Sequence, residues 1–333
     1  MDEDGLDGKA LQQEAIELER RLQEIRTQLN GAQPGRAHVQ IDTFKKYPTK
    51  EAKINSRENM DSDVSKLSLH ALLLLSDSSL PLGSFAFSNG LESFLAHNRT
   101  DRLRNNNTGK ASVHLFHPFL KLSLLNTAST TLPFLLAAYR DSSRLESLDD
   151  IYDASIICTV ARRASVAQGR ALMGVWEKSL ASAPGHSNQT HVVEALRELA
   201  KRLRTLTKDP DDIPSAHAHF GPVFGVVAAA LSIPDRETAY TFLLSHAKAV
   251  LSAGVRAGVL GPFASQAILA GQAVFMRENQ EKEVQGMMGL RELIDYCITK
   301  EWNANVEDAG ITVPAIDLWQ GRHELLYSRI FNS

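Results

Sequence analysis

The stretch over residues 112–140 constrains the fold more than any other part of this sequence. It is apolar nearly throughout, and its apolar residues do not alternate with polar ones as they would in a half-buried strand. Pro118 and Pro133 should divide it into separate helical pieces, because proline lacks the amide donor that a helix interior needs. The stretch therefore predicts that helices build the core of this chain.

Helical signals continue on both sides of this stretch. Helical spacing or a helix start predicts helices over residues 69–75, 149–161 and 191–206 and from Pro234 onward. A further helix should end near residue 180. Strand signals are nearly absent. The nearest match to a hairpin turn, Asn89-Gly90, is followed by a helical pattern. We therefore predict an all-α fold, a single helical-bundle domain of roughly ten helices.

Two uncharged stretches, residues 213–234 and 257–276, are long enough to cross a membrane. Glycine, proline and polar side chains interrupt both of them, and the mean hydropathy of the whole chain is −0.19. We therefore interpret both stretches as buried helices of a sizeable core and expect no membrane partner.

Charge and cysteine content exclude several classes of protein. Lys and Arg number 36 and Asp and Glu number 39, so the net charge of −3 provides no basic field for a nucleic acid. Residues 1–10 are acidic and polar, unlike a targeting signal. Cys158 and Cys297 lie far apart and form no disulfide framework, which is typical of a reducing compartment. We expect a cytoplasmic protein without a nucleic-acid partner.

Residues 1–65 differ in pattern from the rest of the chain and are interpreted as an N-terminal extension. Apolar residues repeat there with heptad spacing, at Leu11, Ala15, Leu18, Leu22, Ile25 and Leu29. The repeat predicts a short amphipathic helix, although it is too short for a stable isolated coiled coil. Residues 31–65 show little periodicity and are expected to be a flexible linker. Residues 66–333 then form the folded domain.

An acidic motif over residues 149–153, DDxxD, suggests one enzymatic alternative. On a helix, Asp149 and Asp153 share a face and could hold Mg²⁺ and a diphosphate, as in all-α isoprenoid synthases. The same acids would also be favoured at a helix start by the helix dipole. The chain shows no second acidic cluster on a facing helix, so this Mg-dependent enzyme is kept as the alternative hypothesis.

Histidine pairs are the other candidate ligands. His114 and His117 lie three residues apart, and His217 and His219 form HxH, which places both rings on one side only in a strand. Structural roles account for both pairs, although a transient contact with a metal ion stays open. No Walker A loop, G-x-S-x-G elbow or activated cysteine is found. We therefore predict no catalytic residue, no structural metal site and no tightly bound cofactor.

Composition does not explain the stretch over residues 80–94. A turn leads there to Phe85 and Phe87, which are expected to enter the core beside the turn. Ser88 or Asn89 should then cap a helix that begins near residue 90.

The carboxyl end, residues 319–333, is also unusual. It combines arginine with aromatic side chains, the composition of an interface hot spot, at a position where chains usually fray. We therefore predict a partner-binding tail, although a last helix docked on its own domain fits the composition about as well. The candidate partner-binding residues are Arg322, His323, Glu324, Tyr327, Ser328, Arg329 and Phe331.

These two stretches together resemble the UreF family of urease accessory proteins. Residues 80–92 are similar to the family's opening motif LPxGxFxxSxGLE, and residues 322–333 are similar to its closing motif RHExxYSRLFxS. Segments 131–140, 161–173 and 218–231 resemble family motifs between them, although Gly221 departs from the pattern. The motif residues carried over are Pro81, Gly83, Phe85, Ser88, Gly90, Leu91, Glu92, Gln168, Gly169 and Arg170.

The resemblance implies a non-enzymatic, all-α protein that dimerises. It also implies binding to a UreD/UreH-type accessory protein and, through it, to a UreG-type GTPase whose hydrolysis the protein helps to regulate. The expected role of the assembly is the delivery of nickel to apo-urease, with nickel handled transiently rather than held as a cofactor.

Overall fold

The structure is a computed structural model that describes residues 67–98, 110–182, 190–205, 216–276 and 286–332. All of them belong to one compact unit, residues 56–333, and the expected extension over residues 1–65 lies outside the described residues. Within the described ranges the chain is mostly α-helical. Two short antiparallel strands, β1 (Phe275–Met276) and β2 (Met287–Met288), pair with each other. The predicted all-α fold is confirmed.

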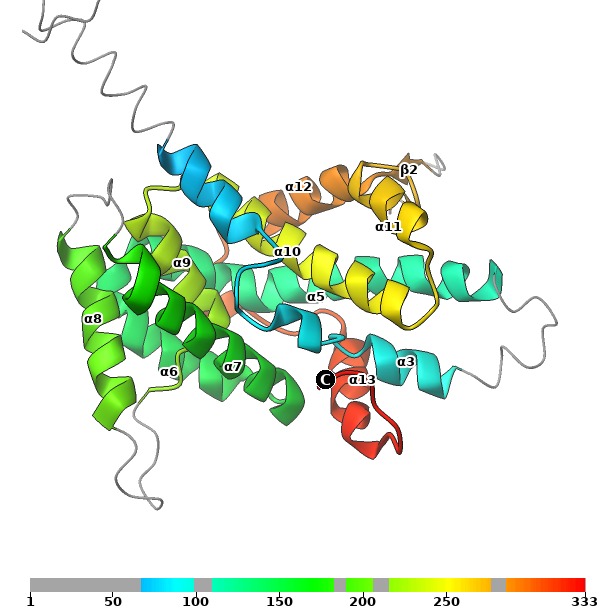
Figure 1. Ribbon diagram of the computed structural model, residues 1–333, viewed down its shortest axis with the longest axis horizontal. Helices are drawn as coiled ribbons and strands as arrows, with labels where there is room; N and C mark the ends of the chain where they lie inside the picture. Colours follow the sequence, from blue (N-terminus) through cyan, green and yellow to red (C-terminus); the bar gives the residue numbers. More distant parts are fainter. Residues whose placement is uncertain (1–66, 99–109, 183–189, 206–215, 277–285, 333) are drawn as a thin grey trace, which may run out of the picture. The chain divides into compact units, whose positions relative to one another are not determined.

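The helices follow one another without long strands between them. In chain order they are a helix over residues 67–76, α3 (Leu91–His97), α5 (Lys110–Arg140), α6 (Leu145–Ser155), α7 (Thr159–Val175), α8 (Thr190–Thr205), α9 (Phe220–Ala230), α10 (Asp235–Arg256), α11 (Pro262–Leu269), α12 (Leu290–Glu301) and α13 (Pro314–Arg322). Helix α5 runs through the middle of the bundle and packs against α9, α10 and α12 (Figure 1). None of these described helices is long and apolar enough to cross a membrane.

Helix α5 is continuous from Lys110 to Arg140, with two prolines inside it. The prediction that Pro118 and Pro133 divide this segment is therefore wrong. Pro133 leaves the carbonyl of Ser129 without its usual helical donor. The amide of Gly310, from a distant loop, donates to that carbonyl at 3.3 Å instead. A tertiary hydrogen bond thus offsets the donor that the sequence lacks.

Helix α9 is buried along nearly its whole length, as expected for the uncharged segment over residues 213–234. Its residues from 221 to 230 are all buried, and they pack against α5, α7 and α8. Gly225 makes the closest approach, because a Cβ there would lie 2.3 Å from the carbonyl oxygen of Leu135. The small residues of α9 therefore determine how closely the central helices pack.

The second uncharged segment, residues 257–276, does not form one buried helix, contrary to the prediction. It contains a turn, the eight-residue helix α11 and β1, and its Phe263 side chain is 89% exposed. Gly258 and Gly271 have φ values of 69° and 103°, and each follows the end of a helix. Glycine in this left-handed conformation is a common helix stop, so backbone signals outweigh the absence of charge.

Residues 149–161 also differ from the expectation, which was a single helix starting at Asp149. Helix α6 begins earlier, at Leu145, and ends at Ser155, and α7 begins only at Thr159. Asp149 therefore lies inside α6, where its side chain is buried. Helix α7 continues through a π-helical turn, Trp176–Leu180, in agreement with the expected end at residue 180.

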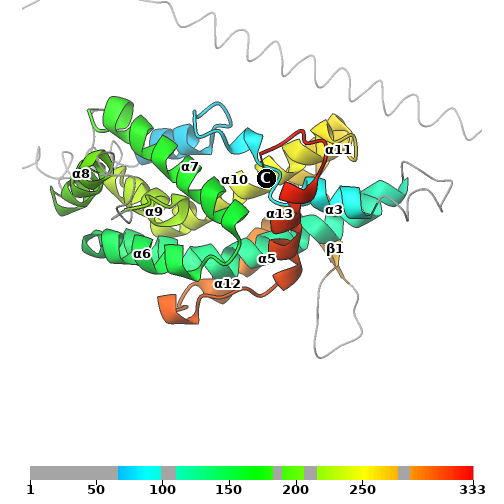
Figure 2. The ribbon, with the colours of Figure 1, turned by 90° about the horizontal axis from the view of Figure 1, so that it is seen from below.

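The end of the chain returns to the first motif. Helix α13 packs against α3, α5 and α7, and the last residues follow α13 closely in Figure 2.

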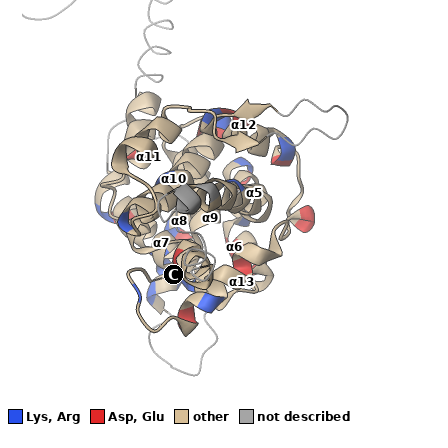
Figure 3. Ribbon diagram, turned by 90° about the vertical axis from the view of Figure 1, so that its right-hand side faces the viewer, with Lys and Arg blue, Asp and Glu red and all other residues tan. Residues whose placement is uncertain are grey.

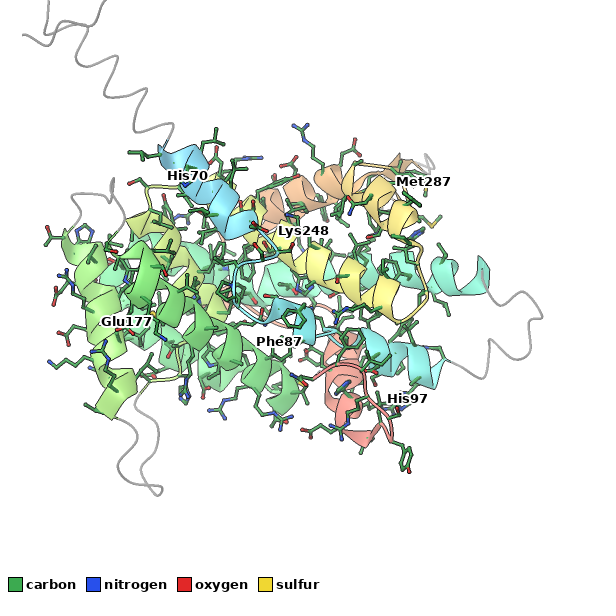
Figure 4. All side chains as sticks on the ribbon, viewed as in Figure 1. His70, Phe87, His97, Glu177, Lys248 and Met287 are labelled. Carbon is green, nitrogen blue, oxygen red and sulfur yellow. The ribbon has the colours of Figure 1, made fainter. Side chains whose placement is uncertain are left out.

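Charged side chains lie mainly on the outer helices in Figure 3, around a hydrophobic core. Lys248 Nζ donates to the carbonyl of Ser76 at 2.9 Å and connects α10 with the helix over residues 67–76 (Figure 4).

Candidate functional site

The two family motifs meet at the carboxylate of Glu92, in the first turn of α3. His323 Nε2 lies 2.9 Å from Glu92 Oε2, and the amides of Ile330 and Phe331 donate to the same carboxylate at 2.6 and 3.2 Å. His323 is fully buried. One side chain of the opening motif therefore holds both ends of the closing motif. We call this region, residues 84–92 with residues 320–332, the motif junction.

Phe331 closes the motif junction from the other side. Its side chain is only 4% exposed, and the guanidinium of Arg256 lies 4.3 Å from the centre of its ring. Arg256 also donates to the carbonyl of Phe85, and the amide of Asn332 donates to the carbonyl of Ala86 at 2.7 Å. Arg256, on α10, was not singled out from the sequence, although it is a cation at the end of a largely apolar helix.

The turn before α3 is shaped by glycine and serine. Gly90 has a φ of 84°, and a Cβ there would lie 3.1 Å from the backbone nitrogen of Gln320 on α13. Ser88 Oγ accepts a hydrogen bond from the amide of Glu92 at 3.3 Å, but the N-cap position of α3 is Gly90 rather than the predicted Ser88 or Asn89. Phe87 is half-buried, but Phe85 is 66% exposed, so the expectation that Phe85 enters the core is wrong.

The remaining residues of the candidate tail point outward from the motif junction. Tyr327 is fully exposed at 107%, and Arg322, Glu324, Ser328 and Arg329 are exposed as well. Glu324 pairs with Arg163 of α7. The predicted tail thus divides into two buried anchors, His323 and Phe331, and an exposed loop between them.

The family-motif residues on α7 pack against other parts of the bundle. Gln168 accepts a hydrogen bond from Ser84 Oγ at 2.9 Å. Gly169 lies against the segment before α9, and a Cβ on it would lie 1.9 Å from the carbonyl oxygen of Ala218. Arg170 Nε donates to the carbonyl of His217 at 3.2 Å.

Asp149 holds backbone rather than a ligand. Its two carboxylate oxygens accept hydrogen bonds from the amides of His217, Ala218 and His219 at 2.8, 2.8 and 2.6 Å. These bonds stabilise the left-handed backbone of Ala218, whose φ is 59°. The arrangement does not support the diphosphate hypothesis, because both oxygens of Asp149 are already engaged.

Asp153 lies among cations and histidines. It pairs with Arg162, and His219 Nε2 and His217 Nε2 lie 2.9 and 3.5 Å from its oxygens. Burial opposes its ionisation, but the hydrogen bonds from Arg162 and His219 outweigh that effect, so the pKa of Asp153 lies below its usual value. Burial lowers the pKa of His219.

None of the described residues supports a metal site of three or more His, Cys, Asp or Glu side chains. His217 and His219 lie on the extended segment before α9, with ring centres 5.8 Å apart. His117 lies beside the ring of Phe275, and the side chain of His114 is outside the described set. The structure therefore brings one predicted histidine pair together, around Asp153.

A cavity of about 150 Å³ lies beside the motif junction, and both polar and apolar side chains line it. Asn126 and Thr130 of α5, His246 of α10 and Asp317 of α13 contribute to it. Burial lowers the pKa of His246 to about 4 and raises that of Asp317. Sequence reasoning missed this cavity, because its polar residues are single positions on helices far apart in the chain.

The fold and the motif junction together define a class of protein. It is an all-α bundle in which the two ends of the domain are joined through one carboxylate and an exposed loop remains at the joint.

Comparison with known proteins identifies the family to which this arrangement belongs. The sequence profile of the UreF family matches residues 113–273. An uncharacterised urease accessory protein UreF-like of Schizosaccharomyces pombe is 35% identical over 269 residues, which cover 81% of this chain and 99% of the relative. Urease accessory protein 6 of Cryptococcus neoformans is 27% identical, over 80% and 97% of the two chains, and urease accessory protein F of Oryza sativa is 27% identical, over 86% and 90%. The chain belongs to the UreF family of urease accessory proteins.

Proposed function

We propose that this urease accessory protein acts by binding. In the proposal it binds a UreD/UreH-type protein, recruits and regulates a UreG-type GTPase, and supports nickel insertion into apo-urease in the cytoplasm. The observation that carries the proposal is the match over 99% of the length of the Schizosaccharomyces pombe relative. The engagement of Asp149 by backbone amides favours a binding role over the diphosphate-dependent alternative.

The exposed loop of the motif junction is the proposed contact with the UreD/UreH-type protein. Tyr327 is an aromatic side chain with no cover from its own domain, and Leu325 is 78% exposed. Arg322 and Arg329 flank them and are also exposed. Aromatic and arginine side chains are enriched among interface residues whose truncation costs about 2 kcal/mol or more.

Nickel is the cargo of the assembly in this proposal. The cavity of about 150 Å³ supports this part of it, because hydroxyl, amide and carboxyl groups form part of its lining. Oxygen and imidazole groups can exchange a divalent cation without forming a closed site. The variant Asp317→Asn should therefore slow nickel delivery while partner binding persists.

Homodimer formation, which the resemblance to the UreF family implies, is part of the proposal. Leu67, Leu69 and Leu73 are exposed on the helix over residues 67–76, and this apolar face supports it. Light scattering over a range of concentrations tests this part, and a monomer at every concentration would contradict it.

Co-purification is the direct test of the binding role. The full chain should co-purify with a UreD/UreH-type protein, and the UreG-type GTPase should join only when that protein is present. The variant Tyr327→Ala should weaken the first contact. A chain that binds neither protein in the absence or presence of nickel would contradict the proposal.

A further inference from the structure

The loop over residues 324–330 begins and ends at the same carboxylate. Glu92 contacts His323 just before the loop and the amides of Ile330 and Phe331 at its end. The side chain of Glu92 is 11% exposed, so its contacts with His323 and the Phe331 amide are largely shielded from water, whereas the bond from the Ile330 amide lies at the surface. A single residue of α3 thus holds both ends of the loop together.

The loop has few other internal restraints. Arg329 donates to the carbonyls of Leu326 and Glu324 at 3.2 and 3.0 Å, and Glu324 pairs with Arg163 of α7; all three contacts are exposed. The side chains of Tyr327 and Leu325 contribute little packing, because both are largely exposed. Exposed hydrogen bonds alone hold a loop weakly, so the conformation of this segment depends on its two ends.

We propose that Glu92 is a positioning residue for partner binding. It holds residues 324–330 in the geometry that presents Tyr327 to the UreD/UreH-type protein, and the inference rests on the contact assigned to this loop under the proposed function. The carboxylate does not touch the partner. It acts through the loop, because a loop ordered before binding loses less conformational freedom on association.

Arg256 supports the same geometry from α10. Its guanidinium covers the ring of Phe331 and donates to the carbonyl of Phe85. Releasing either contact should free the end of the loop without opening the central helices. If the ordered loop is the binding-competent form, affinity falls in proportion to its population.

The test uses the full chain with Glu92→Gln, an amide of the same size. Its NH₂ group would face N–H donors, so the three bonds cannot all form. The matched control is Glu146→Gln, because Glu146 pairs with Arg202 away from the motif junction. Arg256→Gln provides a second route to the same release. Affinity for a purified UreD/UreH-type protein, trypsin cleavage after Arg329 and thermal melting are measured for each variant.

A disulfide provides a readout that a purely structural role would not change. The backbones of Ala86 and Asn332 are hydrogen-bonded at 2.7 Å, so Ala86→Cys with Asn332→Cys should reconnect the tail in the Glu92→Gln background. We expect Glu92→Gln and Arg256→Gln to lose at least about tenfold in affinity and to be cleaved faster. Oxidation should restore the affinity of the Glu92→Gln protein, and reduction should remove it again.

Two results would overturn the inference. One is wild-type affinity in Glu92→Gln although its tail is cleaved faster. The other is a loss of affinity that the oxidised disulfide does not restore. Failure of the proposed contact itself looks different, because Tyr327→Ala would then bind as tightly as the wild-type chain.

Discussion

His323 Nε2 lies 2.9 Å from the carboxylate of Glu92, although 231 residues separate the two in the sequence. This contact joins the first motif of the domain to the last. Because the amides of Ile330 and Phe331 donate to the same carboxylate, the chain end is part of the fold rather than a free tail. The two motifs that identify the family are therefore one structural unit.

The first prediction concerns Asp149. Asp149→Asn should lower the free energy of unfolding by about 2–4 kcal/mol, because an amide cannot accept from three backbone N–H groups as the buried carboxylate does. Asp150, its exposed neighbour, is the control, and Asp150→Asn should change stability by less than about 0.5 kcal/mol. Chemical denaturation of both variants provides the comparison. Equal stabilities would show that the three backbone bonds contribute little.

The second prediction compares two glycines of α7. Gly169→Ala should destabilise the protein by several kcal/mol or prevent folding, because its Cβ would overlap the carbonyl oxygen of Ala218 at 1.9 Å. A Cβ at Gly174 would have no atom within 4 Å, so Gly174→Ala should stabilise the helix by up to about 1 kcal/mol. Thermal melting separates the two outcomes. A well-tolerated Gly169→Ala would mean that α7 and the segment before α9 can move apart easily.

The helical fold was predictable from the sequence, but several of its boundaries were not. Helical spacing indicated α8, and the uncharged stretch over residues 213–234 indicated the buried α9, because both signals are local. It could not indicate that Gly310 replaces the donor missing at Pro133, or that Asp149 holds a distant loop. Both effects depend on tertiary contacts between residues far apart in the sequence.

The candidate site was predictable in part. Composition drew attention to both motifs, but not to their direct contact through Glu92. Composition also could not divide the tail into the buried His323 and Phe331 and the exposed Tyr327, because burial depends on which side chains face α3 and α10. His246 and Arg256 gave no local signal, since neither belongs to a sequence motif within α10.

The third prediction is a pH dependence caused by His246. Burial lowers its pKa to about 4 in the folded state, from 6.5 when exposed, so the unfolded chain takes up the proton first. The neutral ring thus contributes stability that is fully present above pH 6.5 and is lost as the pH falls toward 4, in total up to about 3 kcal/mol. His246→Gln should flatten the decline in unfolding free energy over this range. His70→Gln, at an exposed position, should not, and parallel curves for His246→Gln and the wild-type chain would contradict the assignment.

The fourth prediction separates the two roles within the tail. Phe331→Ala should lower stability by about 3 kcal/mol, because the ring is buried beneath Arg256. Tyr327→Ala should leave melting unchanged and reduce partner affinity by about 30-fold. Deletion of residues 327–333 removes Phe331 and should therefore destabilise the free protein as well as weaken partner binding. Thermal melting and partner pull-down on the same samples distinguish a structural role from a binding role. An unaltered melting temperature for Phe331→Ala would contradict the burial argument.

The nickel content of urease tests the central claim most directly. Urease is purified from a urease-producing host that lacks its own UreF-type protein, with this chain or its Tyr327→Ala variant supplied. If the chain acts as an accessory protein through its exposed loop, wild-type chain should yield nickel-loaded, active urease and the variant should yield much less. Urease that stays nickel-free and inactive, although the wild-type chain is present and folded and the host's other accessory proteins are bound to it, would contradict the account.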